Sequence, residues 1–107
     1  MDYTKAKIYK IVCNETNNVY IGSTIKPLPV RLCEHKSSFN RYKKGKCRYT
    51  SSFEILEKGN YSILLIEDYP CSSRKELQIR ERYHIENTDC INRYIPTRTL
   101  KEWYLDN

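Results

Sequence analysis

Six polar side chains, spread over the chain, have the types and spacing to form one reactive site. They are Tyr9, Tyr20, Arg31, His35, Glu81 and Asn92. A single carboxylate among cationic groups suits phosphodiester chemistry, because a hard divalent ion needs few protein ligands when water and a substrate phosphate fill its other positions. The sequence shows no Ser-His-Asp arrangement, no glycine-rich phosphate loop and no local cluster of three metal ligands. The six residues would suffice for hydrolysis of a phosphodiester.

Glu81 is the most informative member of this set. On a helix predicted over residues 73–87, it shares one stripe with Leu77 and Ile85. A carboxylate among residues expected to face inward should be paired, neutral or bound to a cation. A salt bridge to Arg31 and a metal ion are therefore alternative interpretations of the same position.

The first elements that must position this set are two strands. Residues 6–13 favour β structure and carry apolar groups on both alternating faces, which predicts a central strand covered on both sides. Residues 14–18, NETNN, are typical of a turn, because asparagine tolerates left-handed dihedral angles. Residues 19–22 would return as the second strand of an antiparallel hairpin. We expect Gly22 where a side chain would crowd a neighbour, and the phosphate backbone of a ligand is one candidate for that neighbour.

A helix is predicted next, over residues 28–39. Pro27 and Pro29 fit its start, where proline is tolerated. Arg31 and His35 then lie four residues apart on one stripe of the helix. If the helix packs on the sheet, this stripe lies beside the tyrosines of the two strands.

The middle of the chain supplies a loop, a short helix and a third strand. Residues 40–50 are predicted to be a loop dense in positive charge. Ser51 or Ser52 is expected to cap a short helix that Gly59 ends. Residues 61–69 have the length and apolar character of a third strand in the same sheet.

Two capping patterns mark the helices of the C-terminal part. Ser73 and Glu76 stand in capping-box relation at the start of the last long helix. Thr99 and Glu102 form another candidate capping box, for a short helix near the end of the chain. The apolar side of that short helix would hold Leu100, Trp103 and Tyr104.

These elements predict an α+β fold with a small three-stranded antiparallel sheet flanked by helices. A chain of 107 residues is large enough for a single modest core. We therefore expect one domain over residues 1–107, in which residues 93–107 are a C-terminal extension of uncertain role.

The charge of the chain favours a polyanionic partner. Its net charge is +6, and ten tyrosines and one tryptophan stand among nineteen lysines and arginines. Such a surface suits contact with phosphates and bases. A solvated loop is the other interpretation of the basic segment 40–50. The candidate nucleic-acid contacts are Lys26, Arg41, Lys43, Lys44, Lys46 and Arg48.

Apolar runs and cysteines indicate the compartment. The sequence has no apolar run of bilayer length and no hydrophobic secretory segment after its first residues. Its five cysteines form no CxxC pair, so we expect reduced thiols, mostly in the core. These features predict a soluble intracellular protein of the cytoplasm or nucleus, with no membrane partner.

The ordered set of motifs resembles the GIY-YIG endonuclease family. Ile8-Tyr9 and Tyr20-Ile21-Gly22 look like its paired motif. Arg31 with His35, Glu81 within ERYHI, and Asn92 match the helix arginine, accompanying histidine, metal-binding glutamate and asparagine of the family. Two departures are visible. Lys7 stands at the first glycine of the triplet, and no separate DNA-binding domain is expected to follow. The tail resembles that of small stand-alone members from large DNA viruses and mobile elements.

The resemblance implies a metal-dependent DNA endonuclease. Glu81 would hold one Mg²⁺ or Mn²⁺ per active site, and no small-molecule cofactor is implied. Arg31 would grip a phosphate oxygen and stabilise the transition state, a task that suits its planar fork. The products would carry 5′-phosphate and 3′-hydroxyl ends.

The remaining site residues would act on water or hold the site in shape. Tyr9 would orient or deprotonate the attacking water; as a base it needs a nearby cation, which the metal, Arg31 or Lys26 could supply. Tyr20 would position phosphate or water, and His35 would polarise Tyr9 or relay its proton. Asn92 would hold the glutamate or a local loop.

Two other functions remain open at this point. One is a catalytically inactive nucleic-acid-binding module with the same fold. The other is a small protein-interaction domain, which would leave the basic loop and the inward carboxylate unexplained. Since one active site cuts one strand, a homodimer on DNA is one arrangement that would produce a double-strand break.

Overall fold

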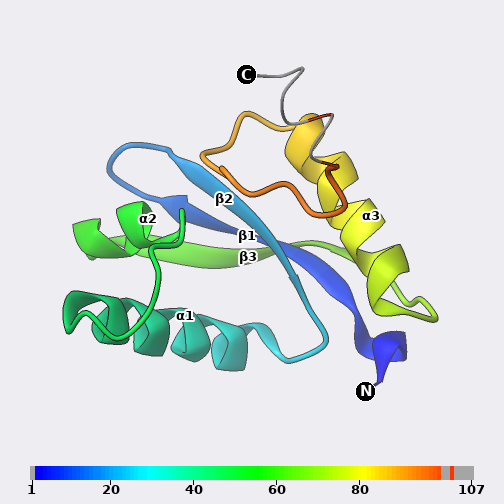
Figure 1. The fold of residues 1–107 in the computed structure, drawn as a ribbon, viewed down its shortest axis with the longest axis horizontal. Helices are drawn as coiled ribbons and strands as arrows, with labels where there is room; N and C mark the ends of the chain where they lie inside the picture. The colour runs from blue at the N-terminus through cyan, green and yellow to red at the C-terminus, as the bar shows by residue number, and fades with distance from the viewer. Residues whose placement is uncertain (1, 100–101, 103–107) are drawn as a thin grey trace.

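A three-stranded antiparallel sheet forms the centre of the computed structural model, which describes residues 2–99 and 102 (Figure 1). The strands lie in the order β2-β1-β3. The elements in chain order are a 3-10 helix η1 (Tyr3–Lys5), β1 (Lys7–Cys13), β2 (Val19–Thr24), α1 (Leu28–Lys43), α2 (Phe53–Lys58), β3 (Tyr61–Asp68) and α3 (Arg74–Glu86). The predicted α+β class and the three-stranded antiparallel sheet are confirmed.

Strand β1 is central because both of its faces are apolar, as predicted. On one face, Ile8 packs in a cluster with Ile21 and Leu77, under α3. On the other face, Tyr9 and Ile11 pack in a second cluster against α1 and α2. Helix α3 therefore covers one side of the sheet and α1 with α2 the other (Figure 1).

The hairpin and the first helix extend beyond their predicted limits. Asn17 takes a left-handed φ of 63° in the turn, as predicted for this segment. Strand β2 continues past Gly22 to Thr24, and α1 continues to Lys43. The prediction of a loop over residues 40–50 is therefore wrong for its first four residues. Pro27 caps α1 and Pro29 lies in its first turn.

The ends of α2 and α3 follow from single residues. Gly59 ends α2 with a left-handed φ of 77°. The Ser73 hydroxyl accepts a hydrogen bond from the Glu76 N–H and caps α3, as predicted. Ser52 precedes α2 but its hydroxyl makes no capping bond. Ser52 thus occupies the predicted N-cap position, and its hydroxyl is left for another partner.

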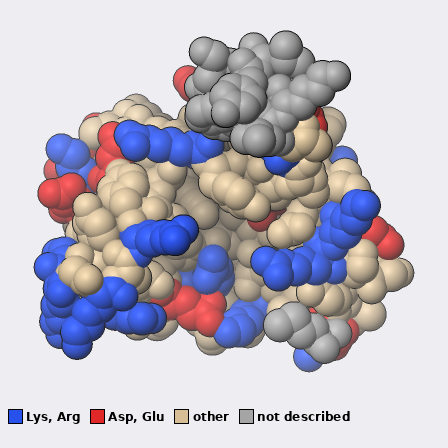
Figure 2. Space-filling view, viewed as in Figure 1, with Lys and Arg blue, Asp and Glu red and all other residues tan. Residues whose placement is uncertain are grey.

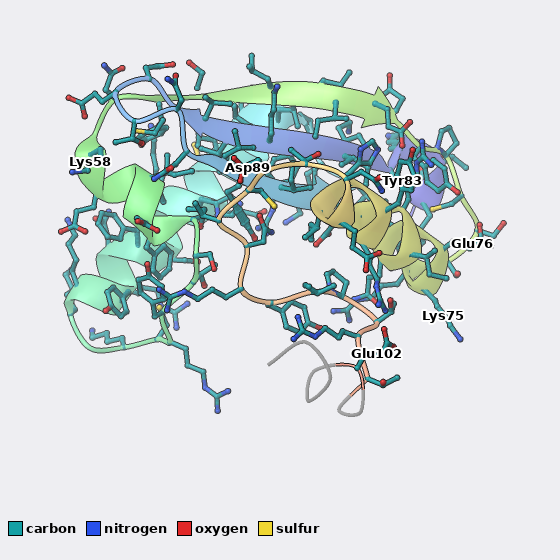
Figure 3. The ribbon with its side chains drawn as sticks, turned by 90° about the horizontal axis from the view of Figure 1, so that it is seen from above. Lys58, Lys75, Glu76, Tyr83, Asp89 and Glu102 are labelled. Atoms are coloured by element: carbon teal, nitrogen blue, oxygen red, sulfur yellow. The ribbon has the colours of Figure 1, made fainter. Side chains whose placement is uncertain are left out.

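The tail after α3 returns alongside that helix (Figure 3). The Glu102 carboxylate pairs with Arg82 of α3 and accepts a hydrogen bond from the Thr99 N–H. The Glu102 N–H donates in turn to the Thr99 hydroxyl, so the predicted capping box forms. Leu100, Trp103 and Tyr104, predicted on the apolar side of a short helix, lie outside the described residues.

Two further observations concern the cysteines and the helix lengths. All five cysteines are free, but only Cys13 is buried, and Cys33 is exposed. Cys71 and Cys90 pack against the core as well, so three of the five thiols lie in or against it, as predicted. No described helix combines the length and the apolar character that a membrane crossing requires.

Candidate active site

A buried network joins β1, α1 and the start of α2. Tyr9 is fully buried, and its hydroxyl oxygen lies 2.7 Å from Nε2 of His35. The same oxygen accepts a hydrogen bond of 3.1 Å from Nε of Arg31. One turn separates Arg31 from His35 on α1, so both side chains reach the same hydroxyl. The four-residue spacing on α1 thus brings Arg31 and His35 to Tyr9, as predicted.

The other side of the His35 ring is held by Ser52. Nδ1 of His35 lies 3.1 Å from the Ser52 hydroxyl, and both residues are buried. Burial and the Arg31 charge lower the pKa of His35 from 6.5 to about 4. A neutral ring fits both contacts if Nδ1–H donates to Ser52 and Nε2 accepts from the Tyr9 hydroxyl. Sequence reasoning missed Ser52 in this role, because the two residues are seventeen positions apart.

Gly22 makes room for the Tyr9 ring. The two residues are paired across β1 and β2. A Cβ atom at position 22 would lie 3.0 Å from Cε1 of Tyr9 and closer still to Cζ and the hydroxyl oxygen. The neighbour that requires a glycine here is therefore a side chain of the protein, and the suggested phosphate backbone of a ligand is not needed to explain it.

Glu81 faces the β2 edge from α3. Its carboxylate accepts a hydrogen bond from the Ser23 hydroxyl of β2. Burial raises the pKa of Glu81, against the opposing effects of the Ser23 bond and the Arg31 charge. The ion pair found for Arg31 among the described residues is to Glu34, with Nη1 and Oε1 3.2 Å apart. The alternative of a direct salt bridge between Arg31 and Glu81 is not what the structure contains.

Two cavities meet at Glu81. The larger, of about 490 Å³, includes Ser23, Arg31 and Glu81 in its lining, and the smaller, of about 300 Å³, lies beside it. Glu81, Tyr20 and Tyr94 line both. The space-filling view shows this face hollowed between the α1 side and the α3 side, with basic side chains on both flanks (Figure 2). The two cavities therefore adjoin each other at Glu81.

The two tyrosines differ in access to these cavities. Tyr20 lines both and is only partly buried. Tyr9 lines neither, because Arg31 and His35 cover its hydroxyl. Burial raises the pKa of Tyr9 to about 12 and outweighs the opposing charge of Arg31. Burial raises the pKa of Tyr20 as well. Both hydroxyls are therefore protonated at neutral pH in this arrangement, because the charge of Arg31 does not offset the effect of burial on the pKa of Tyr9.

The donor set fits a single hard divalent ion at Glu81. Its carboxylate is an oxygen ligand in a cavity and has one hydrogen-bond partner, Ser23. No group of three or more His, Cys, Asp or Glu side chains that could hold a metal occurs in the described part of the chain. A Mg²⁺ site of one carboxylate, water and substrate phosphate matches this composition.

Asn92 fixes the tail to the edge of β2. Its amide accepts from the Ile21 N–H at 2.9 Å and donates to the Ile21 carbonyl at 2.8 Å. The Ile91 N–H also donates to the Val19 carbonyl at 2.8 Å. Asn92 thus holds a segment of the chain in place, the second of its two expected tasks, and no described hydrogen bond joins it to Glu81.

Glu34 is a site residue that sequence reasoning missed. It pairs with both Arg31 and Lys26, and all three line the larger cavity. The hydrogen bond from Lys26 lowers the pKa of Glu34. Its position three residues after Arg31 was an available signal, because this spacing favours an ion pair on a helix. Ser23 and Ser52 gave no such signal, since their partners are distant in sequence.

The other candidate nucleic-acid contacts lie on one flank of the molecule. They are exposed over the C-terminal end of α1 and the loop that follows, where basic side chains gather (Figure 2). Lys43 lies over the Phe39 ring, 4.7 Å from its centroid. The members of this basic flank are Arg41, Lys43, Lys44, Lys46 and Arg48.

Comparison with known proteins identifies the family. The family model described as GIY-YIG catalytic domain matches residues 5–94. The chain belongs to the GIY-YIG family. The fold of this GIY-YIG domain is also that of the catalytic domain of intron endonuclease I-TevI. The TM-score is 0.65 at 22% sequence identity, with 87% of this chain and 97% of that chain covered.

A viral protein is similar in sequence to this GIY-YIG domain. Uncharacterized protein 019R of Invertebrate iridescent virus 6 is 29% identical over 85 residues. The match covers 79% of this chain but only 30% of the viral protein. The GIY-YIG domain thus spans less than a third of that relative. The predicted GIY-YIG family is confirmed.

Proposed function

We propose that this GIY-YIG endonuclease hydrolyses DNA with one divalent ion at Glu81 and leaves 5′-phosphate and 3′-hydroxyl ends. One observation carries the proposal: the Glu81 carboxylate on α3 and the Arg31 guanidinium on α1 line the same cavity. When bound, Mg²⁺ or Mn²⁺ would offset charge on the phosphate and on the leaving oxygen. Glu81 holds the ion, and the Ser23 hydroxyl orients that carboxylate.

Arg31 binds the scissile phosphate. Its guanidinium lines the larger cavity and is half of an ion pair with Glu34. Two oxygens of a phosphate can accept the same pair of parallel hydrogen bonds as a carboxylate, so Arg31 can exchange one anion for the other without leaving the site. Because the cavity wall is partly shielded from water, this contact stabilises charge that develops in the transition state.

Tyr20 is the hydroxyl best placed to hold phosphate or water, since it lines both cavities. Tyr9 reaches the attacking water only if the Arg31 guanidinium moves onto the phosphate, which exposes the hydroxyl oxygen. The Tyr9 hydroxyl then donates its hydrogen bond to Nε2 of His35 through the 2.7 Å contact, which leaves its oxygen to accept from the water, and Ser52 holds the His35 ring in place. With Arg31 in its present place, Tyr9 and His35 act as positioning residues for that arginine.

DNA is the substrate that the charge pattern favours. The basic flank of Arg41, Lys43, Lys44, Lys46 and Arg48 and the cation Lys26 in the larger cavity offer a path for a phosphate backbone. Replacing Lys43, Lys44 and Lys46 together should weaken DNA binding and lower the slope of log affinity against log salt by up to about three. Lys58→Ala, on α2 and lining neither cavity, is the control. An unchanged slope in the triple variant would show that the basic flank is a solvated surface that does not contact DNA.

A plasmid-nicking assay tests the function. Supercoiled DNA should be cut with Mg²⁺ or Mn²⁺ and remain intact with a chelator. Glu81→Ala and Arg31→Ala proteins that stay folded should lose cleavage, whereas Lys58→Ala should retain it. Full activity of the Glu81 variant contradicts the proposal. Binding without cleavage by the unaltered protein would support the inactive nucleic-acid-binding module instead.

The form of the product tests whether two copies act together. A single active site should convert supercoiled plasmid to nicked circles first. If a homodimer acts on DNA, linear product should appear directly and with a second-order dependence on protein concentration. Sizing the protein with and without DNA provides the matching structural readout.

A further inference from the structure

The smaller cavity has no task in the hydrolysis described above. It has a volume of about 300 Å³, at the lower end of ligand pockets, and adjoins the larger cavity through the shared residues Glu81 and Tyr20. A nucleotide next to the scissile phosphate would therefore lie at its mouth. Its lining consists of Tyr20, Tyr49, Thr50, Ser51, Glu81, Asn92, Arg93 and Tyr94.

The walls of this cavity carry aromatic faces that are open to solvent. Tyr94 is 73% exposed and Tyr49 is 43% exposed, although large aromatic side chains usually pack against the protein. The Arg93 guanidinium lies 5.6 Å from the centroid of the Tyr49 ring. Tyrosine rings with a stacked guanidinium form the surface that binds nucleobases by their faces.

Tyr49 is a rigid part of this wall. Its ring packs against Tyr42 and Phe53, with centroids 5.5 Å and 5.9 Å away. Phe53 is almost fully buried and anchors the group to the core. A preformed aromatic platform loses little side-chain entropy when a ligand stacks on it.

The two walls are also fixed to each other. The Arg93 N–H donates a 3.1 Å hydrogen bond to the Ser51 hydroxyl, which joins the tail to the segment that carries Tyr49. Asn92, one residue earlier, clamps the tail to β2. The cavity between the walls therefore keeps its shape without a ligand.

We propose that this cavity receives an unpaired nucleobase next to the scissile phosphate, so that the preferred DNA carries an unpaired or extruded nucleotide at the cleavage site. The inference rests on the proposed nuclease function and deepens it. A base inside a duplex has both faces covered by its neighbours, and only an unstacked base can enter a walled cavity. The cost of extrusion is smallest for a base that is already unpaired.

Binding of the 107-residue chain to labelled duplexes in the presence of a chelator tests this without cleavage. One duplex is fully paired, and the other has the same sequence with a single-nucleotide bulge that contains 2-aminopurine. We expect tighter binding of the bulged duplex and a change in 2-aminopurine fluorescence on binding. Tyr94→Ala should weaken binding of the bulged duplex by roughly 5- to 150-fold, the range for loss of one stacked base.

Two further variants make the test specific. Tyr94→Phe keeps the ring and should keep the preference for the bulge. Tyr83→Ala removes a tyrosine that is 49% exposed on α3 and lines neither cavity, so it should leave the preference unchanged. Equal affinity of the wild type for both duplexes, or a preference that survives Tyr94→Ala, overturns the inference.

The outcomes separate this inference from the proposed function. If the protein cuts plasmid with Mg²⁺ but shows no preference for the bulge, the cavity proposal alone is wrong. If it neither binds nor cuts DNA, the proposed function fails and the cavity proposal fails with it.

Discussion

Replacing Gly22 with alanine should inactivate the site through Tyr9. The added Cβ would lie 3.0 Å from Cε1 of Tyr9 and closer to Cζ and the hydroxyl oxygen. Ordinary contacts between carbon atoms are about 3.5–4.0 Å, so the ring must move by on the order of 1 Å. Because Tyr9 is fully buried, this movement disturbs its packing and breaks its hydroxyl contacts to His35 and Arg31.

The size of the effect follows from these contacts. Overpacking a core costs about 1–3 kcal/mol, and leaving a buried polar group unpaired costs about 1–3 kcal/mol. We expect the free energy of unfolding of Gly22→Ala to fall by about 2–6 kcal/mol. Since a misplacement of about 1 Å can reduce a rate by about 100-fold, cleavage should slow by at least that factor in the folded protein.

The assay pairs urea unfolding with cleavage measured where the variant is still folded. Gly59→Ala is the matched control, because Gly59 has a φ of 77° and nothing within 4 Å of an added Cβ. It should lose stability through its backbone but retain the wild-type cleavage rate. A folded Gly22→Ala protein that cleaves as fast as the wild type would refute the role assigned to the Tyr9 network.

Two more predictions concern neighbours of the site. Ser23→Ala removes the hydrogen bond to Glu81, and we expect half-maximal cleavage to need about 10- to 100-fold more Mg²⁺. Ser23→Thr keeps the hydroxyl and should need the same Mg²⁺ concentration as the wild type. If Ser23→Ala also needs only the wild-type concentration, Ser23 does not position Glu81. Because the folded-state pKa of His35 is depressed to about 4, the unfolded chain protonates first as pH falls. The free energy of unfolding, measured by chemical denaturation, should therefore decrease by about 2 kcal/mol from pH 7 to pH 5. In His35→Gln, most of this decrease between pH 7 and pH 5 should be absent.

Much of the fold follows from local patterns in the sequence. The apolar groups on both faces of β1 predict its central place, and the hairpin length sets the pairing of Tyr9 with Gly22. The four-residue spacing of Arg31 and His35 predicts that they share a neighbour. These features depend on periodicity within one element or between adjacent elements, which a sequence displays directly.

The features that sequence reasoning missed depend on distant partners. Residues 40–43 have no apolar pattern of their own, yet they are helical, and Tyr42 packs on Phe53 with ring centroids 5.3 Å apart. Ser23 meets Glu81 across fifty-eight positions, and neither residue carries a spacing signal for the other. The burial of the Tyr9 hydroxyl beneath Arg31 also results from packing between distant segments. This burial raises the pKa of Tyr9, whereas the sequence suggested that a nearby cation would lower it.

The substitution Glu81→Gln tests the central claim most directly, because it removes the charge and keeps an oxygen that can accept the Ser23 hydrogen bond. Burial raises the pKa of Glu81, so the folded state loses stability as pH rises from the unfolded value of 4.5, and glutamine escapes this loss. At pH 7, Glu81→Gln should therefore be as stable as the wild type or more stable. Its Mg²⁺-dependent cleavage of a labelled DNA should be abolished. Cleavage at the wild-type rate by this folded variant would contradict the assignment of Glu81 as the metal ligand.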